Sequence, residues 1–582
     1  MGKFGTVELL RVNARFTEPT HGPRIIRTQR RPCPVNRPLV ATIPLKFILA
    51  SFFRSNKPLA PAVIAQAAII CIALCVGSHA HAQSDSGAGR STSTALPNLG
   101  DGGDMTPGAE RRLGDRIARE LYRDPDYVDD PVIMEYVQAI WKPLLAAARL
   151  RGELPAELDE AYAWEILLGR DRTVNAFALP GAYMGLHLGL VGVVTSRDEL
   201  ASVMAHELSH VTQRHISRMI SRQNGVAPWL MGAMILGVLA ASKSPGAANA
   251  MIIGGQAAAA QGQLNFSRDM EREADRVGFG VMGQAGFAPQ GFVTMFEKLQ
   301  QANRLNDSGG FPYLRSHPLS TERMADMQDR IPRGSTPPPA GAPANAPELD
   351  QSMIAARARV LSNASVDALR VWSLQAEAAP LARLTPPQQA GTLYGACLAA
   401  IKLRDFAQAK SLWTRLDALV ASNAAAARLA RLLGAELALS QGDGPRALGL
   451  LAVQGSASGP GSSRAELFLR VQAQLQTRAQ SRQMSETAQQ LQTWLADHPR
   501  DAQAWQLLSS AYAAQGRTLG AIRAEAEVNV AQLDYPAALI RLKAAQELIG
   551  KGGAAVDHIE ASIVDTRARQ IEQLLRENPV ER

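Results

Sequence analysis

Five consecutive residues, His206-Glu207-Leu208-Ser209-His210, have the types and the spacing of a metal-hydrolase site. Positions i and i+4 of an α-helix lie on one face, about one turn apart. Two imidazoles placed in this way can bind a single Zn²⁺ ion at about 2.1 Å each. Glu207 lies between them and can take a proton from water that the ion activates. The pentapeptide therefore predicts metal-assisted hydrolysis, with His206 and His210 as ligands and Glu207 as general base.

A catalytic zinc ion needs a third protein ligand, and the best candidate lies in the segment from Ser267 to Arg276. Ser267 can cap a helix there. In that helix Glu271 and Asp275 share one face, whereas Glu273 is turned by roughly 200° from Glu271. We predict Glu271 as the third ligand and Asp275 as the acceptor for the second N–H of a ligand histidine. Without the upstream histidines, the alternating acids and bases would instead indicate a surface helix with salt bridges.

The elements that must position these residues can be outlined from the pattern alone. Ser196 and Glu199 form a capping-box pattern, which predicts that an amphipathic helix carrying the histidines begins near Ser196. His215 is nine residues beyond His206, so a continuous helix turns it to the opposite side, and we expect a surface residue there. Two short strand-like runs, Ala161–Leu168 and Ala182–Leu188, precede the helix. The second run could be an edge strand that pairs with an extended substrate.

The leading residues have the features of an export signal. Basic residues precede an apolar stretch, Ala62–Val76, and the small residues Ala80-His81-Ala82 follow. This order is typical of a secretory signal peptide that is cleaved after Ala82, which would give a periplasmic protein. An uncleaved anchor facing the periplasm is the alternative. Residues 1–45 do not fit a signal peptide, so the true translation start stays open.

The charge of the chain is concentrated in the same leader. The formal net charge is +8, but residues 1–82 hold 11 Lys and Arg and 2 Asp and Glu. The rest of the chain, with 50 basic and 51 acidic residues, is nearly neutral. We therefore expect no nucleic-acid partner for the folded part. Apolar runs at Val226–Ala241 and Ala247–Ala260 could touch a membrane peripherally, but their short length and their glycines favour a pair of helices or a mobile flap over the site.

Composition and the positions of proline- and glycine-rich stretches divide the chain into five parts. A proline-rich stretch, Gly334–Pro347, indicates an interdomain linker. Behind it, Trp505, Leu508, Tyr512 and similar residues recur at offsets that resemble the 34-residue tetratricopeptide helix pair, although a generic helical bundle is the alternative. The predicted parts are a leader (1–82), a flexible lead-in (83–107), a metallopeptidase domain (108–332), a linker (333–348) and a helical repeat domain (349–582).

The histidine motif together with Glu271-Arg272-Glu273-Ala274-Asp275 resembles the HtpX-like zinc peptidases of the gluzincin group. Asn175–Gly181 resembles the strand segment that such peptidases carry before the zinc helix. The export signal and the repeats narrow the resemblance to the periplasmic BepA type. The resemblance implies a mainly α fold with a small antiparallel sheet, followed by a tetratricopeptide-like solenoid, and one zinc ion per chain.

The resemblance also implies a regulatory residue and a biological role. In that branch a histidine of a His-Pro-Leu segment can occupy the fourth zinc position and hold the enzyme off, and His317-Pro318-Leu319 matches this segment. A surface histidine before a proline turn is the alternative. Arg323 could orient substrate or stabilise charge, or form an ordinary salt bridge. The implied role is endoproteolytic quality control of unfolded or outer-membrane proteins, sometimes with chaperone activity, and contact with the outer-membrane assembly machinery through the repeats.

Two other functions stay open at this level. The chain could be a non-enzymatic repeat scaffold or chaperone with a vestigial metal site, although the presence of all three ligand types argues against this. It could also be a different zinc hydrolase, such as an amidase acting on the cell wall. The distant glutamate paired with the histidine helix favours peptide bonds without excluding the amidase.

Overall fold

The computed structural model describes most of the chain beyond Met105. The described residues are 105–222, 266–305, 312–331, 348–377, 379–452, 463–477, 481–551 and 557–577. The predicted leader with its cleavage position, the two apolar runs between residues 226 and 260, and the proline-rich linker lie outside them. Residues Asn98–Arg582 form one compact unit, to which all of the following belongs.

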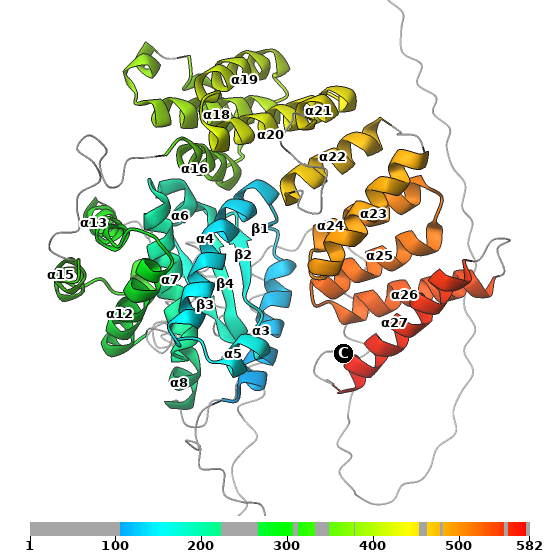
Figure 1. The fold of residues 1–582 in the computed structure, drawn as a ribbon, viewed down its shortest axis with the longest axis horizontal. Helices are drawn as coiled ribbons and strands as arrows, with labels where there is room; N and C mark the ends of the chain where they lie inside the picture. The colour runs from blue at the N-terminus through cyan, green and yellow to red at the C-terminus, as the bar shows by residue number, and fades with distance from the viewer. Residues whose placement is uncertain are drawn as a thin grey trace, which may run out of the picture. The chain divides into compact units, whose positions relative to one another are not determined.

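The first part of the described chain is a small sheet surrounded by helices (Figure 1). Its elements in chain order are α3 (Pro107–Tyr122), β1 (Tyr127–Val128), α4 (Pro131–Leu150), α5 (Ala156–Ala161), β2 (Glu165–Gly169), β3 (Ala176–Leu179), the 3₁₀ turn η1 (Pro180–Ala182), β4 (Tyr183–His187), α6 (Leu188–Val193), α7 (Arg197–Thr212), α8 (His215–Arg222), α12 (Arg268–Gln284), α13 (Gln290–Leu305), α14 (Tyr313–Ser316) and α15 (Thr321–Asp329).

The four strands form one mixed sheet in the order β1-β2-β4-β3. Strands β1 and β3 run antiparallel to their neighbours, but β2 and β4 are parallel, with Ile166 opposite Met184. The predicted antiparallel sheet is therefore wrong for the central pair. The expectation that Ala182–Leu188 forms an edge is also wrong, because β4 lies between β2 and β3. The reversal at η1, where Gly181 has φ +71°, folds β3 back along the outer side of β4.

Helix α7 begins where the sequence predicts, at the N-cap Ser196, whose Oγ accepts a hydrogen bond from the Glu199 amide at 3.2 Å. The Glu199 carboxylate accepts from the amide of Thr195 rather than from that of Ser196. Every residue from Glu199 to Thr212 is buried, so the expected amphipathic helix is wrong. The helix instead runs through the core, in contact with α4, α12, α13 and β3.

Helices α7 and α12 pack closely because a glycine lies between them. A Cβ atom added at Gly278 would come within 3.0 Å of the Ala205 carbonyl oxygen and 3.1 Å of the His206 amide nitrogen. A larger residue at position 278 would push the helices apart. The predicted cap is also present, since Ser267 accepts a hydrogen bond from the Met270 amide and starts α12. The close approach brings the carboxylates of α12 to the histidines of α7.

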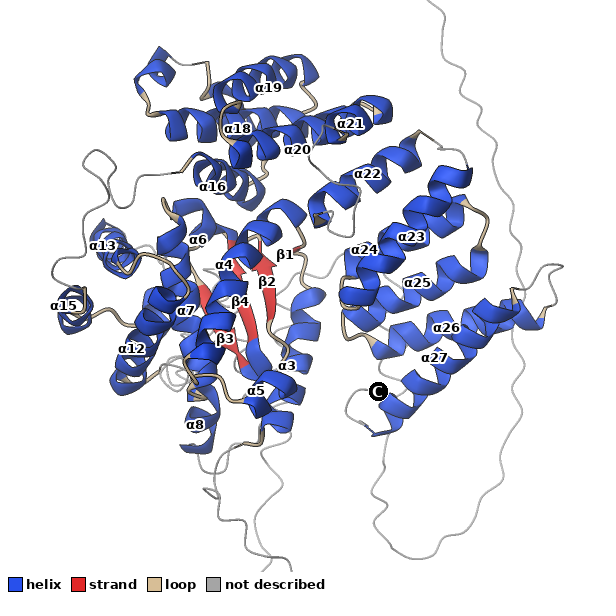
Figure 2. Cartoon of the chain, viewed as in Figure 1, coloured by secondary structure: helices blue, strands red, loops and turns tan. Residues whose placement is uncertain are grey.

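The second part of the described chain is helical throughout its described residues (Figure 2). Its elements are α16 (Leu349–Ser362), α17 (Val366–Leu374), the 3₁₀ turn η2 (Ala379–Arg383), α18 (Pro386–Lys402), α19 (Phe406–Val420), α20 (Ala424–Ser440), α21 (Gly444–Leu451), α22 (Arg464–Gln476), α23 (Ser481–Asp497), α24 (Ala502–Ala514), α25 (Thr518–Ala531), α26 (Tyr535–Gly550) and α27 (His558–Glu577).

Successive helices of this second part pack against one another, which confirms the expected helical solenoid. The helix pair α24–α25 illustrates the packing. Leu508 and Tyr512 are buried, and Gly516, with φ +74°, ends the first helix. A Cβ atom at Gly520 would meet the Tyr512 ring at 3.1 Å, so a small residue allows the second helix to return close to the first. The assignment of these pairs as tetratricopeptide repeats stays a prediction.

A buried ionic cluster ties the solenoid to α4. Arg357 of α16 donates through all three guanidinium nitrogens to Asp130, Glu436 and the Tyr394 hydroxyl, at 2.7–3.1 Å. Asp130 is also the N-cap of α4 and accepts from the Ile133 amide at 2.9 Å. We call Arg357, Asp130, Glu436 and Tyr394 the Arg357 cluster. It joins the two parts of the chain, and every guanidinium nitrogen of Arg357 donates to another member of the cluster.

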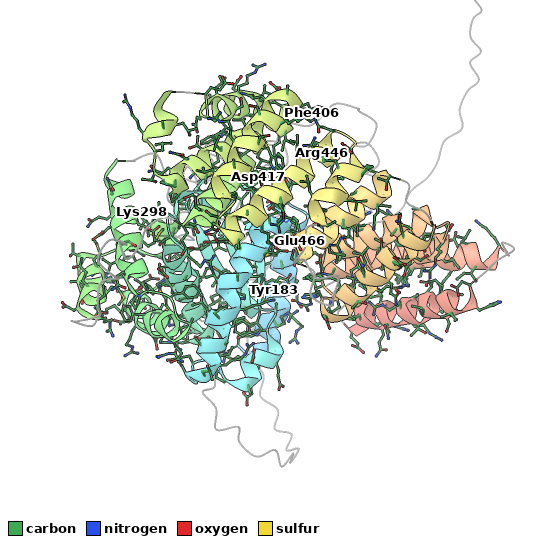
Figure 3. The ribbon with its side chains drawn as sticks, turned by 45° about the horizontal axis from the view of Figure 1, so that its top comes forward. Tyr183, Lys298, Phe406, Asp417, Arg446 and Glu466 are labelled. Carbon is green, nitrogen blue, oxygen red and sulfur yellow. The ribbon has the colours of Figure 1, made fainter. Side chains whose placement is uncertain are left out.

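Two further arginines of the solenoid bind the same end of α4. Arg428 contacts Glu135 at 2.8 Å and Glu466, labelled in Figure 3, at 3.0 Å. Arg464 makes a bidentate pair with Asp129 at 2.6 Å for both bonds. Three solenoid helices thus hold the acidic start of α4.

Among the described residues, no helix combines the length and the apolar composition that crossing a membrane requires.

Candidate metal centre

The two histidines of α7 form one side of a buried group. His206 and His210 are 2% and 0% exposed, and their Nε2 atoms lie 3.0 Å apart. This is the geometry that the i, i+4 spacing predicts. Each ring is turned so that Nε2 faces the same point in the interior. The sequence placed these two residues together, and the structure does so as well.

Helix α12 and the segment before α15 supply the other side. Glu271 approaches both histidines, with its carboxylate oxygens 3.5 Å from Nε2 of His206 and 3.5 Å from Nε2 of His210. His317 lies opposite, with Nδ1 3.0 Å from a Glu271 oxygen and 3.3 Å from Nε2 of His206. One donor atom from each of the four residues lies within 4.8 Å of all the others. All four residues are buried.

This group fits a zinc ion by geometry. Four donors at about 2.1 Å from a tetrahedral ion stand roughly 3.4 Å from one another, and the distances between donor atoms here are 3.0–3.5 Å for five of the pairs. Imidazole nitrogens and one carboxylate are ligands that zinc accepts. Histidine in the fourth direction, where a catalytic site keeps an open position, closes the ligand set.

The charges of the surrounding side chains also fit a divalent cation. Glu207, Glu271 and Asp275 carry three formal negative charges, and among the described residues in contact with them only Arg323 carries a fixed positive charge. Burial opposes ionisation of Glu271, but the neighbouring His317 and His206 outweigh it and hold the pKa of this carboxyl well below its usual range. An anionic ligand is therefore present. A buried excess of negative charge requires compensation, which a metal ion supplies.

Glu207 is fully buried beside the group and is held by the sheet. Its Oε2 accepts a hydrogen bond from the Ala178 amide of β3 at 2.9 Å. Its Oε1 lies 3.4 Å from Nε2 of His317 and has no hydrogen-bond partner among the described residues. One oxygen is therefore anchored, and the other is directed toward the donor atoms. No pattern in the sequence predicts that a strand amide anchors this glutamate.

Asp275 and Arg323 form a support next to the ligands. Nδ1 of His206 lies 2.9 Å from an Asp275 oxygen, as expected for a carboxylate that accepts its second N–H. Arg323 donates to both oxygens of Asp275 at 2.6 and 2.7 Å, and contacts Glu271 at 2.8 Å. Burial works against charging His206, but the hydrogen bonds with Asp275 and Glu271 raise the pKa of this imidazole to about 9 in the metal-free protein.

The expectation for His215 is wrong. It is fully buried, and its Nδ1 lies 2.9 Å from Nδ1 of His210. Helix α7 ends at Thr212, and Arg214 takes φ +53°, so the chain turns back before α8 begins. Extrapolating one continuous helix to residue 215 therefore fails. No glycine or proline marks this break, and the sequence holds no local signal that would have revealed it.

Two further residues near the centre were not anticipated. Nε2 of His215 lies 3.0 Å from the Glu273 carboxylate, which the helical projection had directed away from the site. Tyr313 stacks its ring on His317 with centroids 4.7 Å apart, and its amide donates to the Val174 carbonyl at 3.4 Å. The contacts His215–Glu273 and Tyr313–Val174 join residues more than 50 positions apart, which spacing in the sequence does not predict.

Comparison with known families identifies this part of the chain. Residues 135–331, which include Glu207 and all four converging residues, match peptidase family M48. This part of the chain is therefore similar to the M48 peptidases, and the resemblance to the HtpX-like gluzincin peptidases is confirmed. The family depends on zinc, so the cofactor for which the buried group is suited is a single Zn²⁺ ion.

The individual relatives narrow the class further. The beta-barrel assembly-enhancing protease of Escherichia coli strain K12 is 32% identical over 265 residues, or 45% of this chain and 51% of that protein. A Vibrio cholerae protein given the same name provisionally is 34% identical over 326 residues, or 55% and 63%. The mitochondrial metalloendopeptidase OMA1 of Saccharomyces cerevisiae is 28% identical over 204 residues, or 34% and 56%. The chain thus spans between 51% and 63% of the length of these relatives.

Proposed function

We propose that the chain is a zinc-dependent endopeptidase of the bacterial cell envelope that hydrolyses unfolded or misassembled outer-membrane proteins. The observation that carries this proposal is the buried convergence of His206, His210 and Glu271, with the Glu207 carboxylate beside them. Two imidazoles and one carboxylate form the ligand set of a catalytic zinc site in peptidases.

The proposed chemistry assigns each side chain one task. A zinc ion in the site supplies Lewis-acid polarisation of a peptide carbonyl and lowers the pKa of water. Glu207 acts as general base, because its Oε1 has no hydrogen-bond partner among the described side chains and Oε2 is fixed by the Ala178 amide. It takes the proton from the attacking water and returns it to the leaving amine. Asp275 fixes the orientation of His206.

An extended substrate would pair with β3. This strand is the sheet edge on the side of α7, and its Ala178 amide points to Glu207 rather than to β4. Backbone pairing at an edge strand selects extended, unfolded chains without reading much of their sequence. The sheet edge therefore takes over the role first expected for Ala182–Leu188.

His317 accounts for a resting form of the enzyme. Its Nδ1 lies among the three other donor atoms, and the Tyr313 ring packs against its imidazole. A fourth protein ligand takes the position that an open catalytic site keeps for water or substrate. We infer that His317 must withdraw before cleavage. Arg323 donates hydrogen bonds to Asp275 and to the Pro318 carbonyl, and we infer that it fixes the position of the His317-Pro318-Leu319 segment.

The biological setting follows from the relatives' names and from the leader. The bacterial relatives are named for a protease that enhances beta-barrel assembly. The signal-peptide pattern before Gln83 supports export to the periplasm, where outer-membrane proteins pass in unfolded form. The solenoid is a surface suited to extended partners, and we propose that it binds the outer-membrane assembly machinery. Chaperone activity and peripheral membrane contact belong to the same proposal.

A cleavage assay with a matched catalytic variant tests the proposal. The purified mature chain should contain about one zinc ion and cleave casein or another unfolded protein, and a chelator should abolish cleavage. Glu207→Gln should retain zinc but lose about 10²–10⁴-fold in rate, the usual contribution of a general base. Cleavage by the variant at the wild-type rate would refute the base assignment. Zinc binding without any cleavage would favour the scaffold, and hydrolysis of peptidoglycan alone would favour the amidase.

A further inference from the structure

His210 has two ring nitrogens, and only one of them faces the metal group. Its Nε2 lies 3.0 Å from Nε2 of His206 and 3.5 Å from a Glu271 oxygen. Its Nδ1, on the opposite side of the ring, lies 2.9 Å from Nδ1 of His215. The Phe266 ring packs against the same imidazole, with centroids 3.9 Å apart. His210 is therefore fixed by groups that lie outside the ligand set.

His215 continues the contact to a carboxylate. It is fully buried at the start of α8, and its Nε2 lies 3.0 Å from the Glu273 carboxylate of α12. Arg218, one turn further along α8, contacts the same Glu273 oxygen at 3.0 Å. His215 does not belong to the group of four that can hold a metal, since its near nitrogen faces the rear of His210.

The direction of each hydrogen bond follows from counting protons. When Nε2 of His210 is a metal ligand, the proton of this neutral ring is on Nδ1, which then donates to His215. Nδ1 of His215 is thus an acceptor, and the proton of that ring is on Nε2. This N–H donates to Glu273, whose carboxylate can only accept. Each ring nitrogen of His210 and His215 thus has one role, and no hydrogen bond between them has a proton on both nitrogens.

We propose that His215 and Glu273 form a hydrogen-bond relay that positions His210 for zinc, with Arg218 holding its far end. The proposal rests on the zinc site proposed above and assigns roles to residues that neither the spacing nor the family match identifies. Both residues are positioning residues, because they act through His210. Partners of this kind typically change metal affinity by about 10–100-fold.

The two ligand histidines are then supported in different ways. His206 faces the Asp275 carboxylate directly, with Nδ1 2.9 Å from one of its oxygens, and Arg323 holds that carboxylate. His210 donates to a neutral imidazole, and the carboxylate is one residue further away. Hydrogen bonds to an ionised acceptor are roughly twice as strong as those between neutral groups. Loss of charge at Asp275 should therefore weaken zinc binding more than the same loss at Glu273.

The test measures zinc affinity by competition with a chromophoric chelator, together with the visible spectrum of the Co²⁺-loaded protein. His215→Leu should bind zinc about 10–100-fold more weakly and shift the Co²⁺ bands. His215→Asn should recover most of the affinity, because its side-chain oxygen can accept from Nδ1 of His210. Glu273→Gln should fall between wild type and Asp275→Asn. Asp269→Asn is the matched control, since Asp269 loses the same charge on α12 but is 87% exposed.

The outcomes separate the relay from the site. If His215→Leu does not fold, Glu273→Ala decides, because Glu273 is 28% exposed and its truncation is tolerable. Unchanged affinity and an unchanged Co²⁺ spectrum in His215→Leu or Glu273→Ala would overturn the relay, as would an equal loss in Asp269→Asn. A wild-type chain that does not bind zinc would overturn the proposed metal site itself, independently of the relay.

Discussion

Two buried clusters of charged side chains differ in how completely their members satisfy one another. In the Arg357 cluster, one guanidinium shares its nitrogens among two carboxylates and a hydroxyl, and the bonds are mutual. In the metal centre, ligand atoms of three imidazoles and one carboxylate lie within 4.8 Å of one another. The Arg357 cluster thus contains its own positive charge, whereas the metal centre offers ligand atoms for a cation.

The difference separates an ionic cluster that holds a structure together from one that is built to receive a cation. The Arg357 cluster needs nothing further, because breaking any partner would leave a buried charge. The metal centre keeps acceptor atoms without donors, including Oε1 of Glu207 within the described part of the chain. A buried group with an excess of negative charge is stabilised by a positive ion placed among its ligand atoms. Counting donors against acceptors therefore distinguishes the two clusters without knowledge of function.

The strongest way to break the comparison is to remove one carboxylate from each cluster. Glu271→Ala should lose most of its bound zinc and with it the metal-dependent cleavage, because it removes the carboxylate of the four-residue group and leaves only the three imidazoles. Glu436→Gln, in the Arg357 cluster, should keep about one zinc ion per chain. Metal analysis after dialysis measures both. Equal zinc contents in the two variants would contradict the distinction.

The next effect concerns stability rather than metal. Arg357→Leu leaves the buried Asp130 and the partly buried Glu436 without their counter-charge and should lower the free energy of unfolding by about 3–5 kcal/mol. Zinc content should stay at the wild-type level. Urea unfolding measures the loss, and Arg370→Leu is the control, because its ion pair with Asp367 is exposed and should contribute less than about 1 kcal/mol. A loss no larger than in the control would show that the cluster does not stabilise the fold.

Acidification should remove the contribution of the Arg357 cluster to stability, because it protonates Asp130. Burial opposes ionisation of Asp130, but Arg357 outweighs it and lowers the pKa of Asp130 in the folded chain. A lowered folded pKa contributes stability that is fully present above the unfolded pKa, about 3.9, and is lost as the pH falls through the folded value. In Arg357→Leu, burial without the guanidinium raises the pKa of Asp130, so the stability difference between wild type and variant should narrow as the pH falls from neutrality and continue to narrow below about pH 4, where the wild-type pair is lost. A difference that stays constant between pH 7 and pH 3 would assign it to another group.

The smallest expected effect comes from opening the metal centre. His317→Ala removes the fourth donor and leaves His206, His210 and Glu271 in place, so zinc should be retained and casein cleavage should rise a few-fold. The comparison with Glu271→Ala sharpens the division of roles within the centre. If neither the rate nor the zinc content changes, His317 is no switch ligand.

The sequence predicted those parts of the site that lie within one helix. His206 and His210 share a face of α7, and Glu271 and Asp275 share a face of α12, because four residues make nearly one turn. His215 escaped prediction since α7 ends at Thr212 without a helix breaker.

Features that depend on contacts between distant segments were also missed. Strand order and the parallel pairing of β2 with β4 depend on how separate segments meet. The Arg357 cluster likewise joins residues 130, 357 and 436, and no spacing rule connects them. Local periodicity therefore predicted His206, His210, Glu271 and Asp275, and only the tertiary fold revealed the supports at Ala178, His215 and Glu273.

The carboxylates of α12 have a consequence for what the chain can tolerate. Glu271, Glu273 and Asp275 meet His210, His215 and His206 respectively, all within about one turn of a single helix. Inserting one residue between Ser267 and Glu271 would rotate all three by about 100° and shift them by about 1.5 Å. Such an insertion would thus displace one ligand and two supporting residues together. This stretch should therefore accept substitutions far more readily than changes in length.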